Sequence, residues 1–88
     1  MPYIKADDKC KFNPIFNTIK LADIRIENCG QLNYLITSLC LKYLGDLGEK
    51  YQTYNDIMGA LTGAQLEIYR RKISSYEDLK ISENGDCF

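Results

Sequence analysis

The chain has 88 residues and a mass of 10.1 kDa, which is the size of one compact domain. Its 11 Lys and Arg residues nearly balance 12 Asp and Glu residues, and the net charge of −1 disfavours the basic footprint of a nucleic-acid-binding protein. The absence of histidine removes the commonest general base, the commonest zinc ligand and the Ser-His and Cys-His nucleophile pairs. We therefore expect a single domain over residues 1–88 and no nucleic-acid partner.

The first helical pattern begins at Asn13-Pro14, because Asn is a good N-cap and Pro is tolerated in the first turn of a helix. Apolar residues then recur at helical spacing, namely Phe12, Ile15, Phe16, Ile19, Ala22 and Ile26. The segment Asn28–Gly30 predicts the end of this helix, with Gly30 in a left-handed terminus. Residues 1–12 are expected to form an arm or a short turn.

A second helix is predicted from about Gln31 to Leu44. Its broad apolar face consists of Leu32, Leu35, Ile36, Leu39, Cys40, Tyr43 and Leu44. Gly45 and Gly48 predict a short turn after it, and a connection this short favours an antiparallel neighbour. Because Cys40 lies in the apolar face, it is interpreted as a small core residue.

The third and longest helix is predicted from about Thr53 or Tyr54 to Ile73, with Thr53 as a plausible N-cap. Its expected buried side consists of Tyr54, Ile57, Met58, Leu61, Ala64 and Ile68. Ser74-Ser75 interrupts the pattern, and a short fourth helix follows over Tyr76 to Ser82. We therefore predict an all-α fold, a small helical bundle of three main helices plus a short C-terminal helix.

The four cysteines are far apart and contain no Cys-x-x-Cys pair; they are Cys10, Cys29, Cys40 and Cys87. Because the first residues lack the apolar run of a signal peptide, free thiols in the cytoplasm are favoured over two disulfides. The cysteine spacing and the missing histidine also disfavour zinc, and no cofactor is expected. The longest apolar run, Tyr34–Ile36, is too short to cross a membrane, so no membrane partner is expected.

The segment Tyr51–Asp56 is the most informative candidate site, because six consecutive side chains carry a hydrogen-bonding group and two of them are aromatic. Such a cluster suits recognition of a polar, flat ligand, and a helix cap with solvated neighbours is the equally weighted alternative. On the same helix, Gly59 and Gly63 each cost about 1 kcal/mol relative to alanine. That cost suggests that another helix, a symmetry mate or, less readily, a ligand approaches this part of the backbone closely.

Catalysis by the nearby carboxylates is not favoured. Asp56 and Glu67 are eleven residues apart, about 16 Å along a helix, which is too far for a paired acid and base. Glu67 with Arg70 is more simply an ion pair, and the basic cluster Tyr69–Lys72 suits either phosphate binding or compensation of the helix dipole. No catalytic or metal-binding residue is assigned. The candidate ligand- or partner-binding residues are Asn33, Tyr51, Tyr54, Asn55, Asp56, Glu67, Arg70 and Arg71.

Five segments together resemble a family of small uncharacterised proteins that is common in bacteriophage and prophage genomes and is described only as a domain of unknown function. The segments are Leu32–Thr37, Tyr51–Gly59, Leu66–Arg71, Tyr76–Asp78 and Ser82–Asp86, with the pattern YQTYND, LExYRR, YED and ENGD. The resemblance covers nearly the whole chain. It departs at Thr62–Ala64, where relatives carry bulkier residues, which places any role of Gly63 in doubt.

The resemblance implies a small phage-type accessory protein, located in the host cytoplasm, that binds rather than catalyses. We expect it to sequester or inhibit a host protein or a nucleotide-like small molecule, in a counter-defence role. Because a chain this short buries little surface and is rich in amphipathic Tyr, we also expect a homo-oligomer. The alternatives are a metal-dependent enzyme that acts on phosphate esters through Asp56 and Glu67, and a purely structural or regulatory docking protein.

Overall fold

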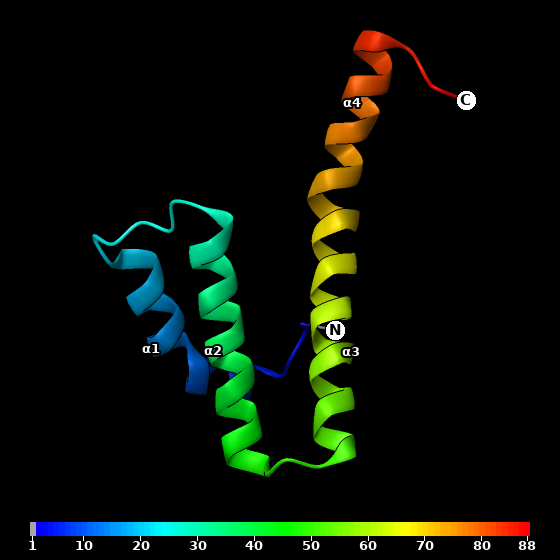
Figure 1. Cartoon of the computed structure of the whole chain (residues 1–88). Helices are drawn as coiled ribbons and strands as arrows, with labels where there is room; N and C mark the ends of the chain where they lie inside the picture. Colours follow the sequence, from blue (N-terminus) through cyan, green and yellow to red (C-terminus); the bar gives the residue numbers. More distant parts are fainter. Residues whose placement is uncertain (1) are drawn as a thin grey trace. The chain divides into compact units, whose positions relative to one another are not determined.

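The computed structural model describes residues 2–88 (Figure 1). Four α-helices follow one another, α1 (Ala6–Leu21), α2 (Cys29–Leu47), α3 (Tyr51–Ile68) and α4 (Ser74–Asn84), with a π-helical segment, η1 (Tyr69–Ile73), between the last two. No strand occurs within residues 2–88, so the predicted all-α fold is confirmed. The contacts divide the chain into an N-terminal unit, Tyr3–Ile57, and a C-terminal unit, Met58–Phe88 together with Pro2.

Helix α1 begins well before the predicted start at Asn13. The N–H of Lys9 donates to the carbonyl of Lys5 at 3.0 Å, and Asp7 and Asp8 lie in the first turn, where negative charge complements the helix dipole. Pro14 is therefore an interior residue of α1 rather than its first one. The prediction of an arm was wrong for residues 6–12, because acidic residues at the start stabilise a helix that also accommodates an internal proline; residues 2–5 are not helical, and residue 1 lies outside the described residues.

Helix α1 also ends before the predicted segment Asn28–Gly30. The N–H of Ala22 makes the last helical bond, to Thr18, and residues 22–28 are not helical. Asn28 instead begins α2, because its side-chain oxygen accepts from the N–H of Gln31 at 2.8 Å, while the side chain of Gln31 accepts from the N–H of Glu27 at 2.7 Å. This reciprocal arrangement resembles a capping box, and it places Gly30 in the first turn of α2.

The turn between α2 and α3 is formed by residues 48–50. Gly48 adopts a φ of 85°, a conformation that L side chains rarely take, and its N–H closes α2 by donating to Leu44 at 2.8 Å. Gly45 lies inside α2, contrary to the predicted turn. Helix α3 begins at Tyr51, so Thr53 is an interior residue of the first turn and not the N-cap.

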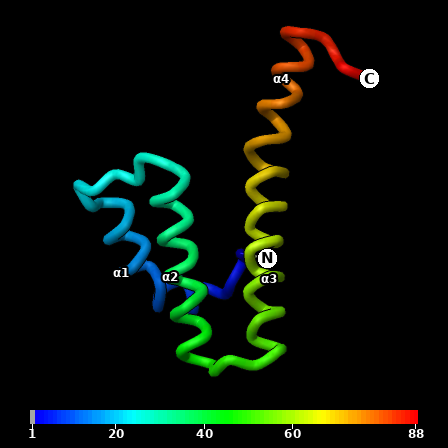
Figure 2. The backbone as a smooth tube through the Cα atoms, viewed as in Figure 1, coloured from blue at the N-terminus to red at the C-terminus, as the bar shows by residue number. Residues whose placement is uncertain are grey.

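The predicted break at Ser74-Ser75 does not occur, and α3, η1 and α4 join into one 34-residue helix (Figure 2). The N–H of Ser74 donates to the carbonyl of Tyr69, five residues back, which is the hydrogen bond of a π-turn. Ser74 keeps helical dihedral angles, and neither proline nor glycine lies nearby to end the helix. The helix ends at Gly85, which has a φ of 86°.

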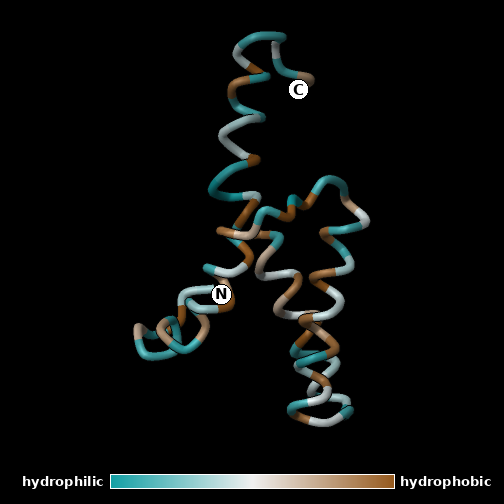
Figure 3. The backbone as a smooth tube through the Cα atoms, turned by 90° about the vertical axis from the view of Figure 1, so that its left-hand side faces the viewer, coloured by the Kyte–Doolittle hydropathy of each residue, from teal (hydrophilic) through white to brown (hydrophobic). Residues whose placement is uncertain are grey.

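Few side chains are buried. Among the described residues, the buried ones are Ile57, which is 8% exposed, and Thr53, which is 2% exposed. The predicted buried side of α3 is otherwise wrong for its large members, which are exposed, namely Tyr54, Met58, Leu61 and Ile68. Cys40, on α2, was predicted as a core residue and is only half-buried. Hydrophobic positions follow the helices (brown in Figure 3), yet little of the chain covers them. The periodicity identified helices correctly, but it did not identify a core.

All four cysteines are free thiols. Within residues 2–88, no helix combines the length and the hydropathy needed to cross a bilayer.

Candidate functional site

The predicted polar and aromatic cluster occupies the first two turns of α3. Thr53 and Ile57 are four residues apart and share one side of the helix, where both are buried. Tyr51 and Asn55 lie about 200° around the helix from Thr53, on the opposite side, because each residue advances about 100°. Tyr51 is accordingly 81% exposed. The buried pair thus anchors the start of α3 and directs the cluster outward.

Hydrogen bonds connect this part of α3 to α2 and to the turn. The hydroxyl of Tyr43, on α2, donates to Asp56 Oδ2 at 2.8 Å, and Gln52 Nε2 donates to Asp56 Oδ1 at 2.7 Å. The hydroxyl of Tyr54 donates to Glu49 Oε1, in the turn, at 3.0 Å. We call this set the tyrosine–carboxylate surface; its members are Tyr43, Glu49, Tyr51, Gln52, Tyr54, Asn55 and Asp56.

Both bonded tyrosines have a raised pKa. The hydrogen bond to Asp56 is the main cause for Tyr43, and the hydrogen bond to Glu49 is the main cause for Tyr54. In both cases the protonated hydroxyl donates to the carboxylate, and this bond favours the neutral form of the tyrosine. The outward oxygens of this surface are consequently hydrogen-bond acceptors. A ligand that pairs with these oxygens has to supply donors, while the hydroxyl of Tyr51 and the amide of Asn55 can themselves donate.

The other predicted site residues belong to α2 and to the C-terminal unit. Asn33 is on α2, about 21 Å along the axis from the end of that helix, and its side chain accepts from Thr37 at 2.9 Å. Glu67 forms an ion pair with Arg70, and Arg71 lies in η1; all three belong to the C-terminal unit. Of the eight predicted residues, the structure brings together Tyr51, Tyr54, Asn55 and Asp56.

The expected close approach to the glycine-bearing side of α3 is not found at Gly59. A Cβ added there would meet no atom within 4 Å among residues 2–88. The helix therefore tolerates Gly59 without a packing requirement at that position.

The carboxylates show no arrangement for metal chemistry. Both oxygens of Asp56 accept hydrogen bonds, from Tyr43 and from Gln52, while Glu67 pairs with Arg70. No group of three or more Cys, Asp and Glu residues that could hold a metal ion occurs in the described part of the chain. The alternative of a metal-dependent enzyme gains no support from this geometry.

Three members of the surface, Tyr43, Glu49 and Gln52, are absent from the eight predicted residues, although Gln52 belongs to the segment Tyr51–Asp56. Tyr43 was assigned to an apolar face, although its hydroxyl needs a polar partner when the ring packs near other groups. The sequence does contain a signal for the contact of Tyr43 with α3, because the short turn brings residues before Gly45 alongside residues after Lys50. Nothing in the local sequence marks Glu49 as a partner of Tyr54, because a single acidic residue in a turn is usually only solvated.

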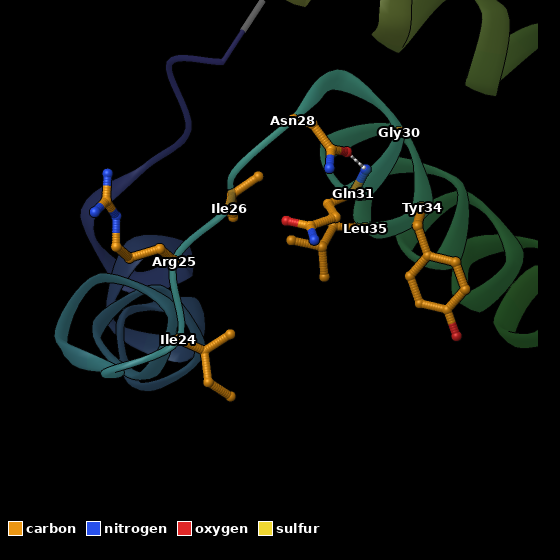
Figure 4. Close-up of a pocket in the computed structure, with 8 residues that line it drawn as sticks. All are labelled: Ile24, Arg25, Ile26, Asn28, Gly30, Gln31, Tyr34 and Leu35. Atoms are coloured by element: carbon orange, nitrogen blue, oxygen red, sulfur yellow. Dashed lines mark hydrogen bonds between the residues drawn. The ribbon is translucent and has the colours of Figure 1, made fainter.

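A concave feature lies in the N-terminal unit, between the segment after α1 and the start of α2 (Figure 4). We call it the α1–α2 cleft. It has a volume of about 550 Å³, and its lining consists of Ile24, Arg25, Ile26, Asn28, Gly30, Gln31, Tyr34 and Leu35. No sequence pattern indicated this cleft, because residues 22–26 were assigned to the first helix.

Residues 1–87 match the family described as Domain of unknown function (DUF6899). The chain belongs to this family. The predicted resemblance to a domain of unknown function is thereby confirmed over almost the whole chain, while phage origin is not part of what the match carries. Neither a curated protein nor a solved structure matches the DUF6899 chain. Its function consequently has to be argued from its two surfaces.

Proposed function

We propose that this DUF6899 protein is a non-catalytic binding protein that docks on a host protein and so sequesters or inhibits it. The supporting observation is the tyrosine–carboxylate surface, which combines exposed aromatic rings with fixed hydrogen-bond acceptors. Tyrosine is enriched at protein interfaces because its ring gives contact area with little loss of conformational entropy. The bonds from Tyr43 and Tyr54 hold two of these rings in place before binding.

The same surface favours a protein partner over a nucleotide-like ligand. Residues 49–56 carry two carboxylates, Glu49 and Asp56, and one ammonium group, Lys50, for a net charge of −1. The hydroxyl protons of Tyr43 and Tyr54, two of the three tyrosines of the surface, are already donated to these carboxylates. A phosphate would meet like charge, whereas arginine or lysine on a protein would meet acceptors and aromatic faces.

The biological setting follows the resemblance to phage-encoded proteins. On this proposal the protein works in the host cytoplasm, in a counter-defence role, and as a homo-oligomer. Small helical proteins that lack catalytic constellations act by occupying a surface of their target, which fits the acceptor-rich site described above. This part of the proposal rests on the likeness to phage sequences, and fold alone does not assign a function.

Native mass spectrometry of the full chain, purified from a phage-infected bacterial host, tests the proposal. We expect a retained host protein, which the triple variant Tyr51→Ala, Tyr54→Ala and Asn55→Ala loses while keeping the same helical circular dichroism. The matched control, Tyr76→Ala with Asn84→Ala, changes exposed residues of α4 and should retain the partner. Equal retention by both variants would contradict the assigned surface, and retention of a nucleotide in place of a protein would contradict the partner class.

A further inference from the structure

The C-terminal unit contains one continuous helix and, among the described residues, no second helix to cover it. The unit holds α3 from Met58 onward, η1, α4 and the tail, together with Pro2. Large side chains of this helix are accordingly exposed, namely Ile68 at 56%, Ile73 at 42%, Tyr76 at 59% and Leu79 at 54%. These fractions hold with the whole chain present, so within its own unit each side chain is at least as exposed.

The π-turn brings these side chains onto one side of the helix. In an uninterrupted α-helix, Ile73 would lie about 140° around the axis from Ile68, and Tyr76 about 80°. The hydrogen bond from Ser74 to the carbonyl of Tyr69 spans five residues in place of four, so the residues after it are turned back by about 100°. Ile73 and Tyr76 then lie within about 40° of Ile68, and Leu79 neighbours Tyr76 at a spacing of three. We call these four residues the C-terminal stripe.

Charges are segregated along the same helix. Residues 67–72 carry one acidic group and three basic ones, a net charge of +2, contributed by Glu67, Arg70, Arg71 and Lys72. Residues 77–86 carry four acidic groups and one basic one, a net charge of −3, contributed by Glu77, Asp78, Lys80, Glu83 and Asp86. The helix is therefore complementary to a reversed copy of itself, whereas a copy in the same direction would place like charges together.

Lys72 and Glu83 are the charged residues nearest to the two ends of the C-terminal stripe. Lys72 precedes Ile73 by one residue, and Glu83 follows Leu79 by four, on the same side of α4. The ion pair of Glu83 with Lys80, at 3.2 Å, is exposed and contributes little, so Glu83 can accept from a further cation. The stripe is thus bounded by a basic residue at one end and an acidic residue at the other.

We infer that the C-terminal stripe is the interface of an antiparallel, two-fold symmetric homodimer. With the two-fold axis between residues 77 and 78, Lys72 of one copy lies opposite Glu83 of the other, and Tyr76 lies opposite Leu79, because the members of each pair are equally far from the axis. The symmetry repeats each contact, so two charge pairs flank a shared apolar centre. This inference rests on the homo-oligomeric part of the proposed function and assigns a surface to it.

Sedimentation velocity and light scattering on the full chain, over a concentration series, test the interface through a charge exchange. We expect the wild type to reach twice the chain mass. Lys72→Glu and Glu83→Lys should each raise the dissociation constant of the dimer about tenfold or more, because each places like charges opposite one another twice. An equimolar mixture of the two variants should dimerise as the wild type does, since every position 72 then faces an opposite charge at position 83.

Two further variants separate the stripe from the general charge of the helix. Asp78→Lys changes the charge as Glu83→Lys does, but it lies about 200° around α4 from Tyr76 and should keep the dimer. Leu79→Ala should raise the dissociation constant about tenfold, because it removes part of the apolar centre. All four substitutions change exposed residues of a helix, so circular dichroism should stay close to that of the wild type.

A wild type that stays monomeric throughout the series would overturn the inference, because the stripe would then be solvated or covered by the chain itself. Single charge variants that dimerise as tightly as the wild type would overturn it too, and so would a mixture no tighter than either variant alone. The host partner is proposed to bind the N-terminal unit, so its loss in the triple tyrosine and asparagine variant does not depend on these results. The failure of one proposal is therefore distinguishable from the failure of the other.

Discussion

Replacement of Ile57 by alanine tests whether the N-terminal unit depends on its one buried large apolar side chain. Ile57 is 8% exposed, and Ile57→Ala removes three carbon atoms worth about 0.8 kcal/mol each when they are buried. The sum is about 2.4 kcal/mol. Substitutions of this kind cost about 2–5 kcal/mol when the cavity term is included. Because the surrounding side chains are largely exposed and can relax, we expect a loss near the lower end, about 2–3 kcal/mol.

Urea unfolding followed by circular dichroism measures this loss, with Leu66→Ala as the matched control. Leu66 is 64% exposed, and its replacement changes helix propensity only slightly, so the free energy of unfolding should change by about 0.5 kcal/mol or less. Equal losses for Ile57→Ala and Leu66→Ala, within about 0.5 kcal/mol, would show that Ile57 does not anchor α3 beneath the tyrosine–carboxylate surface.

Three further predictions concern local interactions of the N-terminal unit. The raised pKa of Tyr43 contributes stability that is fully present below the usual value of 10.0 and is lost as pH rises through the higher value in the folded state. The free energy of unfolding of the wild type should therefore approach that of Tyr43→Phe at alkaline pH. A difference between the two that stays constant with pH would contradict this. Asn28→Ala should cost about 1 kcal/mol in urea unfolding, because Gln31 loses its cap. Pro14→Ala should increase helical circular dichroism and stability, by up to about 3 kcal/mol, because α1 gains an internal hydrogen bond; a loss of helicity would contradict the placement of Pro14.

The sequence predicted helices more reliably than it predicted their ends. Helical periodicity over residues 31–44 and 54–68 identified α2 and α3, because a regular apolar face occurs only in a structure of that period. Asn13-Pro14 and Asn28 carry similar local signals, yet only Asn28 acts as a cap. The distinguishing feature is Gln31, whose side chain completes the reciprocal bonds. A cap signal was thus decisive only where a partner three residues later supported it.

Part of the candidate site was predictable because it is contiguous. Tyr51–Asp56 is one run of residues at the start of a helix, so local composition was sufficient to find it. The bonds from Tyr43 to Asp56 and from Tyr54 to Glu49 depend on the angle set by the turn at Gly48, which composition does not encode. The α1–α2 cleft depends on where α1 ends, and that boundary was misplaced.

Burial was the least predictable property, for a physical reason. An apolar face indicates that a residue will be covered, but it does not say which surface covers it. In this chain Phe16, Leu39 and Met58 keep their helical spacing and are 60–62% exposed. The periodic pattern is therefore better understood as a set of contact surfaces than as a core.

The most direct test of the central claim, that this protein binds donor-rich protein surfaces and not nucleotides, is a nuclear magnetic resonance titration. Backbone amide signals of the labelled full chain would be followed while a short arginine-containing peptide, and separately adenosine triphosphate, is added. We predict shifts confined to residues 43–56 with the peptide and none there with the nucleotide. Shifts of residues 49–56 with adenosine triphosphate and none with the peptide would contradict the account.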